Sequence, residues 1–370
     1  MNNFIKNAIS GSVFRGCLLT LMMIFSTENI WGQENRISWK EALDQPETWY
    51  GSEEAQRIAD NVILYQNNNG GWLKNIDMAD KLSAPEIAKL KREKSLKSGT
   101  TIDNGATHTQ LRYLAKVYDA TQKHQYKEAF LKGLDFLLEA QYDNGGWPQF
   151  YPVKKGYSEH ITFNDDAMMG VMNLLRDIAY QKEPFQFVNK ERCERSKSAI
   201  EKGLEIILKT QVEVDGKLTV WGAQHDKDDL KPAKARSYEL ASLSGKESVM
   251  IVEYLMEIEE PGEEVINAIR SAVKWFEENK IMDIEMVWEK DASFPRGYNR
   301  LAIEKPGAGP LWARFYQIGT NKPIFVGRDG ILKETHNEIE HERRAGYSYL
   351  GNYAEELLNK KYPAWVKKHQ

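Results

Sequence analysis

The sequence predicts a predominantly helical fold, an α/α toroid of three helical hairpins with short β segments and long loops. Two observations lead to this prediction. A glycine-rich turn that ends in tryptophan recurs at Trp72, Trp147 and Trp221, so the repeat is about 75 residues long. Amphipathic helical patterns flank each turn. Repeated hairpins of this length are typical of rings or partial rings of helices, whereas a four-helix bundle does not need such similar connections.

The turns resemble one another closely. The first two read NNGGW at 68–72 and DNGGW at 143–147, and a looser copy, DGKLTVW, spans 215–221. Each turn follows a helix that ends in glutamine. Glycine supplies the positive φ that the chain needs just past a helix. An equally good explanation is that the motif only stops a helix and adds a packing tryptophan.

Periodicity predicts the other elements in chain order. The outer helices, such as the one over 126–141, carry charges and one apolar face. The helices after the turns are more apolar, which suits burial on most sides; they cover 111–118, 169–175 and 249–255. In the last third, β-branched residues, prolines and glycines predict short strands or extended loops over 281–304 and 322–333, followed by helix over 338–359.

The first 32 residues have the pattern of a secretory signal peptide. Lys6 and Arg15 precede an apolar run, 17–25, that is too short to cross a bilayer comfortably. An uncleaved anchor is the alternative. Residues 33–370 are then a single catalytic domain, secreted or periplasmic, and Cys193 is its one remaining cysteine, so we expect no disulfide.

The charge balance restricts the partners. The 370-residue chain has a formal net charge of −4, which argues against nucleic-acid binding. A local group of arginines can still bind an anionic substrate against the net charge. We expect no membrane contact after signal cleavage, and a monomer, because no heptad or apolar stripe demands a partner.

A long irregular connection, 231–248, interrupts the helical pattern and carries Arg236 at its centre. Loops of this length inside a compact domain are usually functional or disordered. Tyr238, Leu240 and Leu243 give this loop side chains to pack with, which favours a functional loop. We expect Arg236 to meet acidic residues from two other helix starts.

Those two helix starts read TIDN at 101–104 and TFNDD at 162–166. Asp and Asn are favoured N-caps, so simple capping is one interpretation. The two copies occupy matching places in the repeat, which brings Asp103, Asp165 and Asp166 to the same end of the ring. Clustered carboxylates and amides are ligands that calcium prefers, although the absence of an EF-hand loop means that solvent or substrate must complete the shell.

Other common chemistries lack their motifs. The sequence has no HExxH, no zinc pattern of cysteines, no G-x-S-x-G elbow and no phosphate-binding glycine loop. Arginine instead recurs beside aromatic residues late in the chain, at Arg296, Arg314 and Arg328. Arginine binds a carboxylate through two parallel hydrogen bonds, and aromatic faces suit a sugar ring, although each aromatic alone is more often a core residue.

Taken together, these stretches resemble the motifs of the polysaccharide lyase family 10 pectate lyases. The resemblance extends from about residue 67 to about residue 353. The motifs in order are TIDNGAT (101–107), DNGGWPQFYP (143–152), FNDDAM (163–168), PAKARSYELASLSGKES (232–248), PLWARFY (310–316) and FVGRDG (325–330). The resemblance implies an α/α toroid that cleaves polygalacturonate by β-elimination with Ca²⁺.

The resemblance also implies roles for individual residues. Arg236 matches the proposed catalytic base, and Asp165 matches a calcium-binding aspartate. Asp103 and Asn104 match residues beside the scissile bond and the metal, so Asp103 is expected to take part in catalysis and Asn104 in substrate binding. The other expected substrate-binding residues are Arg314 and Arg328, which match arginines that hold substrate carboxylates, and Lys74, in GGWLKN, which resembles a further cleft segment.

Two alternative functions are consistent with the same residues. A glycoside hydrolase on the same toroid would use two carboxylates, for which Asp103 and Asp165 are the candidates. A non-catalytic pectin-binding protein would keep the cleft without turnover. A lyase differs from both because it leaves a double bond conjugated to the carboxyl group of its product.

Overall fold

The computed structural model describes residues 37–94 and 99–369. The predicted signal peptide, 1–32, lies outside these residues. Helices dominate: α1 (Trp39–Leu43), α2 (Glu53–Tyr65), α3 (Ala84–Glu93), α4 (His108–Thr121), α5 (His124–Glu139), α6 (Ala167–Ala179), α7 (Lys190–Thr210), α8 (Glu247–Met256), α9 (Glu263–Glu278), α10 (His341–Gly346) and α11 (Tyr362–Lys368). Within the described residues, none of them is both long and apolar enough to cross a membrane.

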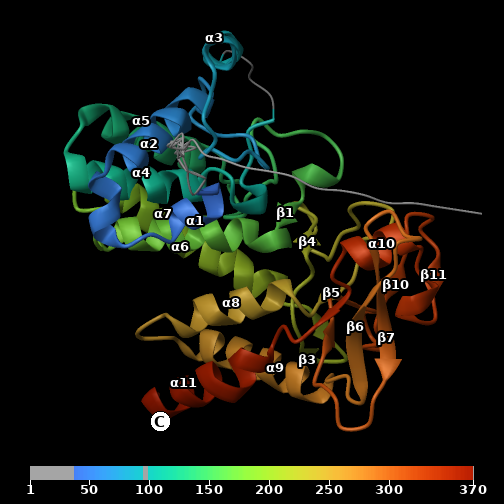
Figure 1. The fold of residues 1–370 in the computed structure, drawn as a ribbon. Coiled ribbons are helices and arrows are strands. Elements are labelled where there is room, and N and C mark those ends of the chain that lie inside the picture. The colour runs from blue at the N-terminus through green and yellow to red at the C-terminus, as the bar shows by residue number, and fades with distance from the viewer. Residues whose placement is uncertain (1–36, 95–98, 370) are drawn as a thin grey trace, which may run out of the picture. The chain divides into compact units, whose positions relative to one another are not determined.

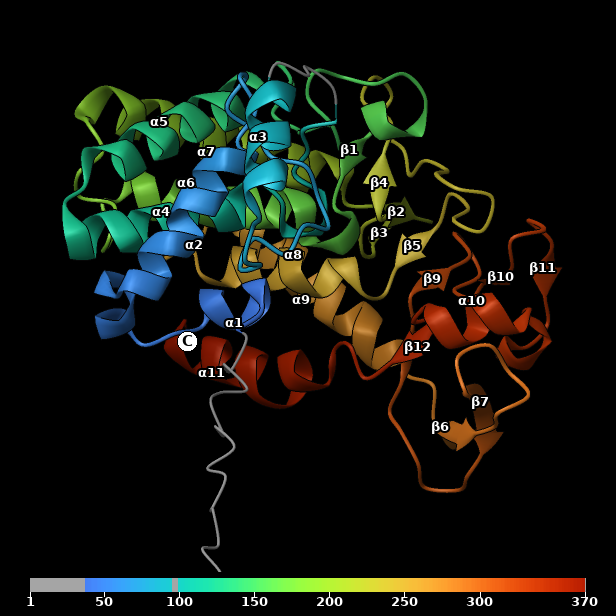
Figure 2. The same ribbon diagram turned by 45° about the horizontal axis from the view of Figure 1, so that its top comes forward.

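The helices form two layers, as Figures 1 and 2 show. In the outer layer α2 contacts α5, α5 contacts α7 and α7 contacts α9. In the inner layer α4 contacts α6 and α6 contacts α8, and each inner helix packs on outer ones. The order outer, inner, outer, inner along the chain confirms the predicted α/α fold of repeated hairpins.

The glutamine and tryptophan of each repeat hold the layers together in the same way. The Trp72 indole donates to the Val62 carbonyl at 2.8 Å, and the indoles of Trp147 and Trp221 bond back to the preceding helix likewise. The side chain of Gln66 donates to its own turn and to Ala129 on the next outer helix. The other two repeats contain the same hydrogen bond to the next outer helix, from Gln141 to the Ala199 carbonyl and from Gln211 to the Ala268 carbonyl.

The turn motif therefore has a structural role. Gly70 and Gly145 have φ of +100° and +97°, and a Cβ at Gly145 would collide with the Lys202 carbonyl oxygen. The three repeat tryptophans are fully buried. The interpretation of this motif as a helix stop with a packing tryptophan is confirmed for these residues, and the residues that follow it carry the side chains of the site.

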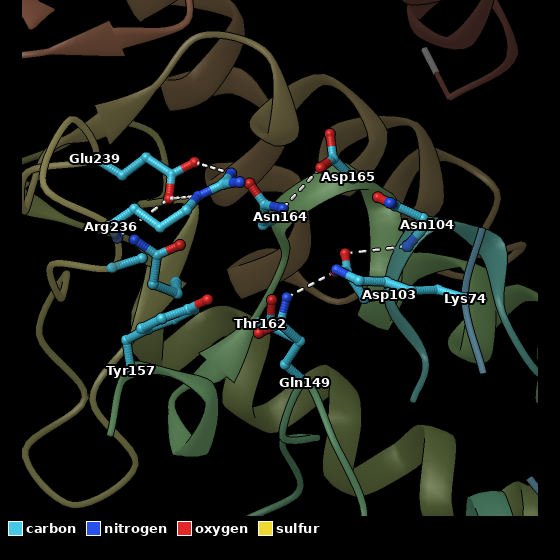
Figure 3. Close-up of a pocket in the computed structure, with 12 residues that line it drawn as sticks. Lys74, Asp103, Asn104, Gln149, Tyr157, Thr162, Asn164, Asp165, Arg236 and Glu239 are labelled. Carbon is cyan, nitrogen blue, oxygen red and sulfur yellow. Dashed lines mark hydrogen bonds and ion pairs between the residues drawn. The ribbon is translucent and has the colours of Figure 1, made fainter. Parts of the chain in front are cut away.

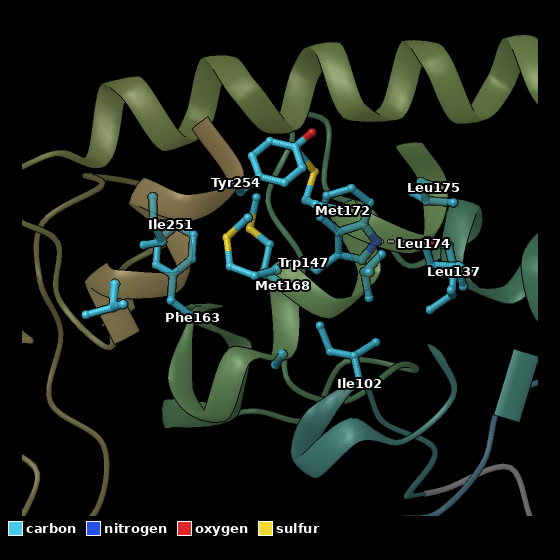
Figure 4. Packing of buried hydrophobic residues seen from close by; sticks show 14 of the residues in the cluster. Ile102, Leu137, Trp147, Phe163, Met168, Met172, Leu174, Leu175, Ile251 and Tyr254 are labelled. Atoms are coloured by element: carbon cyan, nitrogen blue, oxygen red, sulfur yellow. Dashed lines mark hydrogen bonds between the residues drawn. The ribbon is translucent and has the colours of Figure 1, made fainter. Parts of the chain in front are cut away.

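The core lies between the two layers (Figure 4). Trp147 packs there with Met168 and Met172 of α6, and Phe163 and Ile251 extend the cluster toward α8; all five are fully buried. Burial of each such side chain contributes about 1.5–3 kcal/mol. This core fixes the ends of the inner helices, where the polar pocket lies.

The last third of the chain contains short hairpins as well as helices. β6 (Ile284–Lys290) pairs with β7 (Tyr298–Glu304), and β10 (Phe325–Val326) pairs with β11 (Leu332–Lys333), as the sequence predicts. Other short strands are β1 (Ile161–Thr162), β2 (Glu213–Val214), β3 (Lys217–Leu218), β4 (Gln224–His225), β5 (Leu243–Ser244), β8 (Trp312–Ala313), β9 (Phe315–Tyr316) and β12 (Leu350–Gly351).

The single helix predicted over 338–359 is wrong. The chain instead forms the short α10, then strand β12, and only later a π-helical turn, Leu357–Lys361, that leads into α11. The reason is tertiary: β12 pairs with β8, and the Tyr349 carbonyl accepts a hydrogen bond from the Arg314 amide at 2.7 Å. Long-range strand pairing here overrides local helix propensity.

Candidate active site

A polar pocket of about 90 Å³ lies where the inner helices begin (Figure 3). Five residues predicted from the sequence line it, namely Lys74, Asp103, Asn104, Asp165 and Arg236. Seven other residues of the wall were not among the predicted site residues: Gln149, Tyr157, Thr162, Asn164, Gln224, Ala235 and Glu239. The fold thus brings segments more than 160 residues apart into one site.

Asp103 and Asp165 lie on two matching turns just before α4 and α6. Each turn is one 3₁₀ unit, Asp103–Gly105 and Asn164–Asp166, with a left-handed residue in the middle: Asn104 at φ 50° and Asp165 at φ 49°. Asn and Asp are the non-glycine residues that tolerate this region best. The N-cap positions belong to Thr107 and Asp166, and neither makes a side-chain capping bond, so the capping interpretation is wrong.

Asp103 is buried and fully engaged. Its Oδ2 accepts from the Gln149 amide at 2.7 Å and from the Lys74 ammonium group. Its Oδ1 accepts from the Asn104 backbone N–H at 3.0 Å. Lys74 and Gln149 each stand two residues after a repeat tryptophan, so consecutive repeats hold this carboxylate together.

Asp165 lies in a network of opposite charges. Its Oδ1 accepts from Lys246 and from Arg314, both at 2.9 Å, and its Oδ2 accepts from Asn164 at 2.8 Å. Burial alone would raise the pKa of Asp165, but Arg314 and Lys246 outweigh it and hold this pKa far below the ordinary value. Asp165 is therefore ionised near neutral pH.

Asp166, the next residue, behaves in the opposite way. Burial and the neighbouring Glu247 carboxylate raise the pKa of Asp166 to about 6. Its side chain makes no hydrogen bond or ion pair with any residue that the structure describes. The residues packed around these two adjacent aspartates shift their pKa values in opposite directions, and of the two only Asp165 lines the pocket.

Lys246 and Glu247 belong to a third helix start that the sequence reasoning did not identify as a copy of the first two. The Ser244 amide donates to the Trp221 carbonyl, as Thr101 does to Trp72 and Thr162 to Trp147. Glu247 accepts from the Arg314 guanidinium at 2.5 Å. The signal was present in SGKES, which follows the third tryptophan as TIDNG follows the first.

Arg236 lies at the edge of the pocket, opposite the two aspartates (Figure 3). Its Nε donates to Glu239 Oε2 at 2.7 Å, and its Nη2 donates to Glu239 Oε1. The Tyr238 ring lies 4.9 Å from the guanidinium carbon. Arg236 therefore shares the pocket with Asp103 and Asp165, the acids of the two helix starts that it was expected to meet, but its ion pair is with a carboxylate three residues away on its own loop.

Glu239 also determines the charge of Arg236. Burial lowers the pKa of Arg236, but the hydrogen bonds and charge of Glu239 outweigh it and raise this pKa above its already high ordinary value. Glu239 is buried and accepts a further hydrogen bond from the Tyr347 hydroxyl at 3.0 Å.

The two late arginines lie outside the pocket wall. Arg314 is buried beneath Asp165, and its Nη2 bonds to Asp165, Glu247 and Asn164. Arg328 is exposed and pairs with Glu342, with 2.7 Å between Nε and Oε2. Substrate binding by either arginine stays a prediction.

The pocket residues can supply some of the ligands of a calcium ion but not a complete coordination shell. Asp165, Asp103 and Asn104 supply the hard oxygen atoms that calcium prefers, and Gln149 Oε1 is buried without a hydrogen-bond partner. However, no three acidic, histidine or cysteine residues among those described group closely enough to hold a metal. The expected cluster of Asp103, Asp165 and Asp166 is not formed, so most ligands would have to come from substrate and water.

Comparisons with known proteins agree with this fold and pocket. A family model described as pectic acid lyase matches residues 66–358. A family 10 polysaccharide lyase from Cellvibrio cellulosa shares 36% sequence identity, with a TM-score of 0.72 over 87% of this chain and 95% of that one. A mutant of such a lyase from the same organism, in complex with trigalacturonic acid, matches with the same identity and TM-score over 86% of this chain. No curated protein sequence matches.

The family match, together with the two-layer helical fold and the polar pocket at the starts of its inner helices, identifies this protein as a polysaccharide lyase. More particularly, the chain belongs to the pectic acid lyase family and is similar to family 10 polysaccharide lyases. Membership of a lyase family rules against the hydrolase and the non-catalytic binder.

Proposed function

We propose that this enzyme is a pectate lyase that cleaves α-1,4-linked polygalacturonate by β-elimination to unsaturated oligogalacturonates. The family match and the relative bound to trigalacturonic acid support the substrate. The observation that carries the proposal is that Arg236, Asp103 and Asp165, from three different repeats, line one pocket. Arginine binds carboxylates through two parallel hydrogen bonds, so Arg236 in this pocket suits a substrate that is itself anionic.

The reaction removes the C5 proton of a galacturonate unit. Arg236 takes this proton, the C–H electron pair forms the C4–C5 double bond, and the C4–oxygen bond of the glycosidic link breaks. The departing oxygen receives its proton from water. Lys74 and Asn104, on the opposite side of the pocket, orient the sugar, and Asp103 holds Lys74 in place.

Calcium is the proposed cofactor, held by Asp165 with Asp103 and Asn104 nearby. When bound, it neutralises the substrate carboxylate and stabilises the negative charge that develops beside C5. The structure supports Asp165 in this role, because its carboxylate is ionised and lies in the pocket wall. Arg314 and Lys246 hold this carboxylate in one orientation.

Arg236 must lose a proton before it can act as the base, and its ion pair with Glu239 stabilises the protonated guanidinium. Only the deprotonated fraction of Arg236 can accept the C5 proton, and this fraction rises with pH. The proposal therefore predicts turnover that increases steeply toward alkaline pH.

The test is the ultraviolet absorbance of polygalacturonate incubated with the purified protein, with added calcium and with excess chelator. A rise that the chelator stops is the expected result. Reducing ends that appear without absorbance would mean hydrolysis and would overturn the proposal. Absorbance that rises equally in excess chelator would support the lyase activity and refute the requirement for calcium.

We also propose that residues 1–32 are a cleaved signal peptide and that residues 33–370 act as one monomeric domain, secreted or periplasmic. The single unit formed by residues 37–370 supports this division. N-terminal sequencing of the exported protein and its mass in solution test both statements.

A further inference from the structure

A second pocket, of about 310 Å³, adjoins the catalytic pocket and shares two of its wall residues, Lys74 and Asn104. Its other walls come from the N-terminal helix α1, the segment 73–77 and the start of α4. A polymer chain that passes Lys74 and Asn104 on its way out of the catalytic pocket would therefore enter this one. None of the predicted site residues other than these two belongs to it.

This second pocket is built by defined contacts. The Trp39 backbone amide donates to Asp77 Oδ1 at 2.9 Å, and the Trp39 ring packs on Tyr113 with ring centroids 5.1 Å apart. These contacts hold α1 against the segment 73–77. Asn104 Nδ2 donates to Asn75 Oδ1 at 2.8 Å, which joins the two pockets across their shared wall. Both asparagines have positive φ, which asparagine tolerates better than most residues.

The second pocket contains one cation without an acidic partner. Its cationic residues are Lys40 and Lys74; Lys74 pairs with Asp103, whereas Lys40 is exposed and forms no ion pair with any residue that the structure describes. Its one acidic residue, Asp77, accepts hydrogen bonds from two backbone N–H groups, those of Trp39 and Ala79. An exposed ammonium group with no acidic partner favours an anionic ligand.

The rest of the lining suits a sugar ring. Leu73 is 40% exposed and presents an apolar face, while Asn75, Asn104 and Thr109 supply amide and hydroxyl groups for sugar hydroxyls. A uronic acid unit combines these features: one apolar face, several hydroxyls and one carboxylate.

We propose that the second pocket is a binding subsite for a further galacturonate unit of the chain held in the catalytic pocket, with Lys40 binding its carboxylate. This proposal rests on the proposed function and adds a second binding position for the polygalacturonate chain. Because no hydrogen bond or ion pair joins the Lys40 side chain to a described residue of the catalytic pocket, Lys40 affects binding and leaves the chemical step unchanged.

The test compares Lys40→Gln and Lys40→Glu with a matched control, Lys197→Gln, an exposed lysine on the outer helix α7. The substrates are trigalacturonate and hexagalacturonate. Loss of one exposed charge pair predicts a KM for the hexamer about two- to fivefold higher in Lys40→Gln, with unchanged kcat, and a larger rise in Lys40→Glu. In an end-labelled hexamer, the preferred cleavage position shifts away from products that need this subsite.

A KM and cleavage pattern equal to those of Lys197→Gln would overturn the subsite. Binding of hexagalacturonate by calorimetry provides a readout that does not depend on turnover, so the subsite is tested even if elimination is not observed. Wild-type protein that binds the hexamer through Lys40 yet forms no unsaturated product would refute the proposed reaction alone. Hexamer affinity that is the same in wild type and Lys40→Glu would refute the subsite alone.

Discussion

Asp165→Asn tests the charge network that holds the site. The substitution keeps the shape and the left-handed φ, which asparagine tolerates well. It removes the charge that accepts hydrogen bonds from Lys246 and from Arg314, whose side chain is only 5% exposed. A hydrogen bond to a charged group contributes about 1.5–3 kcal/mol, but Arg314 keeps its bond to Glu247. We expect the free energy of unfolding to fall by about 2–4 kcal/mol at pH 7.

The neighbouring substitution Asp166→Asn is the control. Asp166 has the same backbone region but no partner among the described residues, and its pKa of about 6 shows that its charged form is disfavoured in the fold. Neutralising it should leave the protein as stable as wild type at pH 7, or more stable by at most about 3 kcal/mol. Chemical denaturation of both variants at pH 7 measures the difference. Equal stabilities would refute the idea that paired charges at Asp165 hold the site together.

The free energies of unfolding of Asp165→Asn and Asp166→Asn should also differ in their pH dependence, because the folded protein lowers the pKa of Asp165 and raises that of Asp166. A lowered folded pKa means that Asp165 stabilises the fold above its unfolded pKa, about 3.9, and that this contribution is lost as the pH falls below that value. A raised folded pKa means that Asp166 destabilises the fold progressively between about pH 4 and pH 6. The gap between the two variants should therefore be wide at pH 7 and narrow toward pH 3.

Four further outcomes are expected. Arg236→Ala should lower kcat by about 10²–10⁴-fold, the usual contribution of a general base, with little change in substrate binding by calorimetry; near-normal turnover would exclude Arg236 as the base. Glu239→Gln should move the alkaline rise of kcat to lower pH, because the carboxylate raises the pKa of Arg236, and an unmoved profile would contradict that coupling. Gly145→Ala should cost at least about 1 kcal/mol in thermal unfolding, because φ is +97° and the new Cβ meets a backbone carbonyl; an unchanged melting temperature would show that this turn can relax. Asp165→Asn should also lose its response to calcium titration in the absorbance assay, whereas a normal response would remove Asp165 from the proposed metal site.

Local patterns were sufficient for much of the architecture. The period of the tryptophan turns and the spacing of apolar residues predict the hairpins, because both depend on contacts within one repeat or with the next. The same argument placed Asp103 and Asp165 at one end of the helices, since equivalent positions in stacked repeats face the same way. Family motifs added Arg236 and Lys74, which share this pocket.

The partners of these side chains required the tertiary structure. Which carboxylate neutralises Arg236 depends on how its loop turns, and the answer, Glu239, lies three residues away with Tyr347 from a distant segment behind it. Arg314 belongs under Asp165 because β8 and β9 carry it there, and the predicted helix over 338–359 gives way to a strand that pairs with β8.

Repeats, apolar spacing and motifs thus predict the helical hairpins, the family and the end of the fold where the pocket lies. The charges that meet there depend on long-range folding, because ion pairs and short strand pairings join residues that no local periodicity relates. Asp165 and Asp166 show this most clearly: they are adjacent and chemically identical, yet the residues packed around them give one a lowered pKa and the other a raised one.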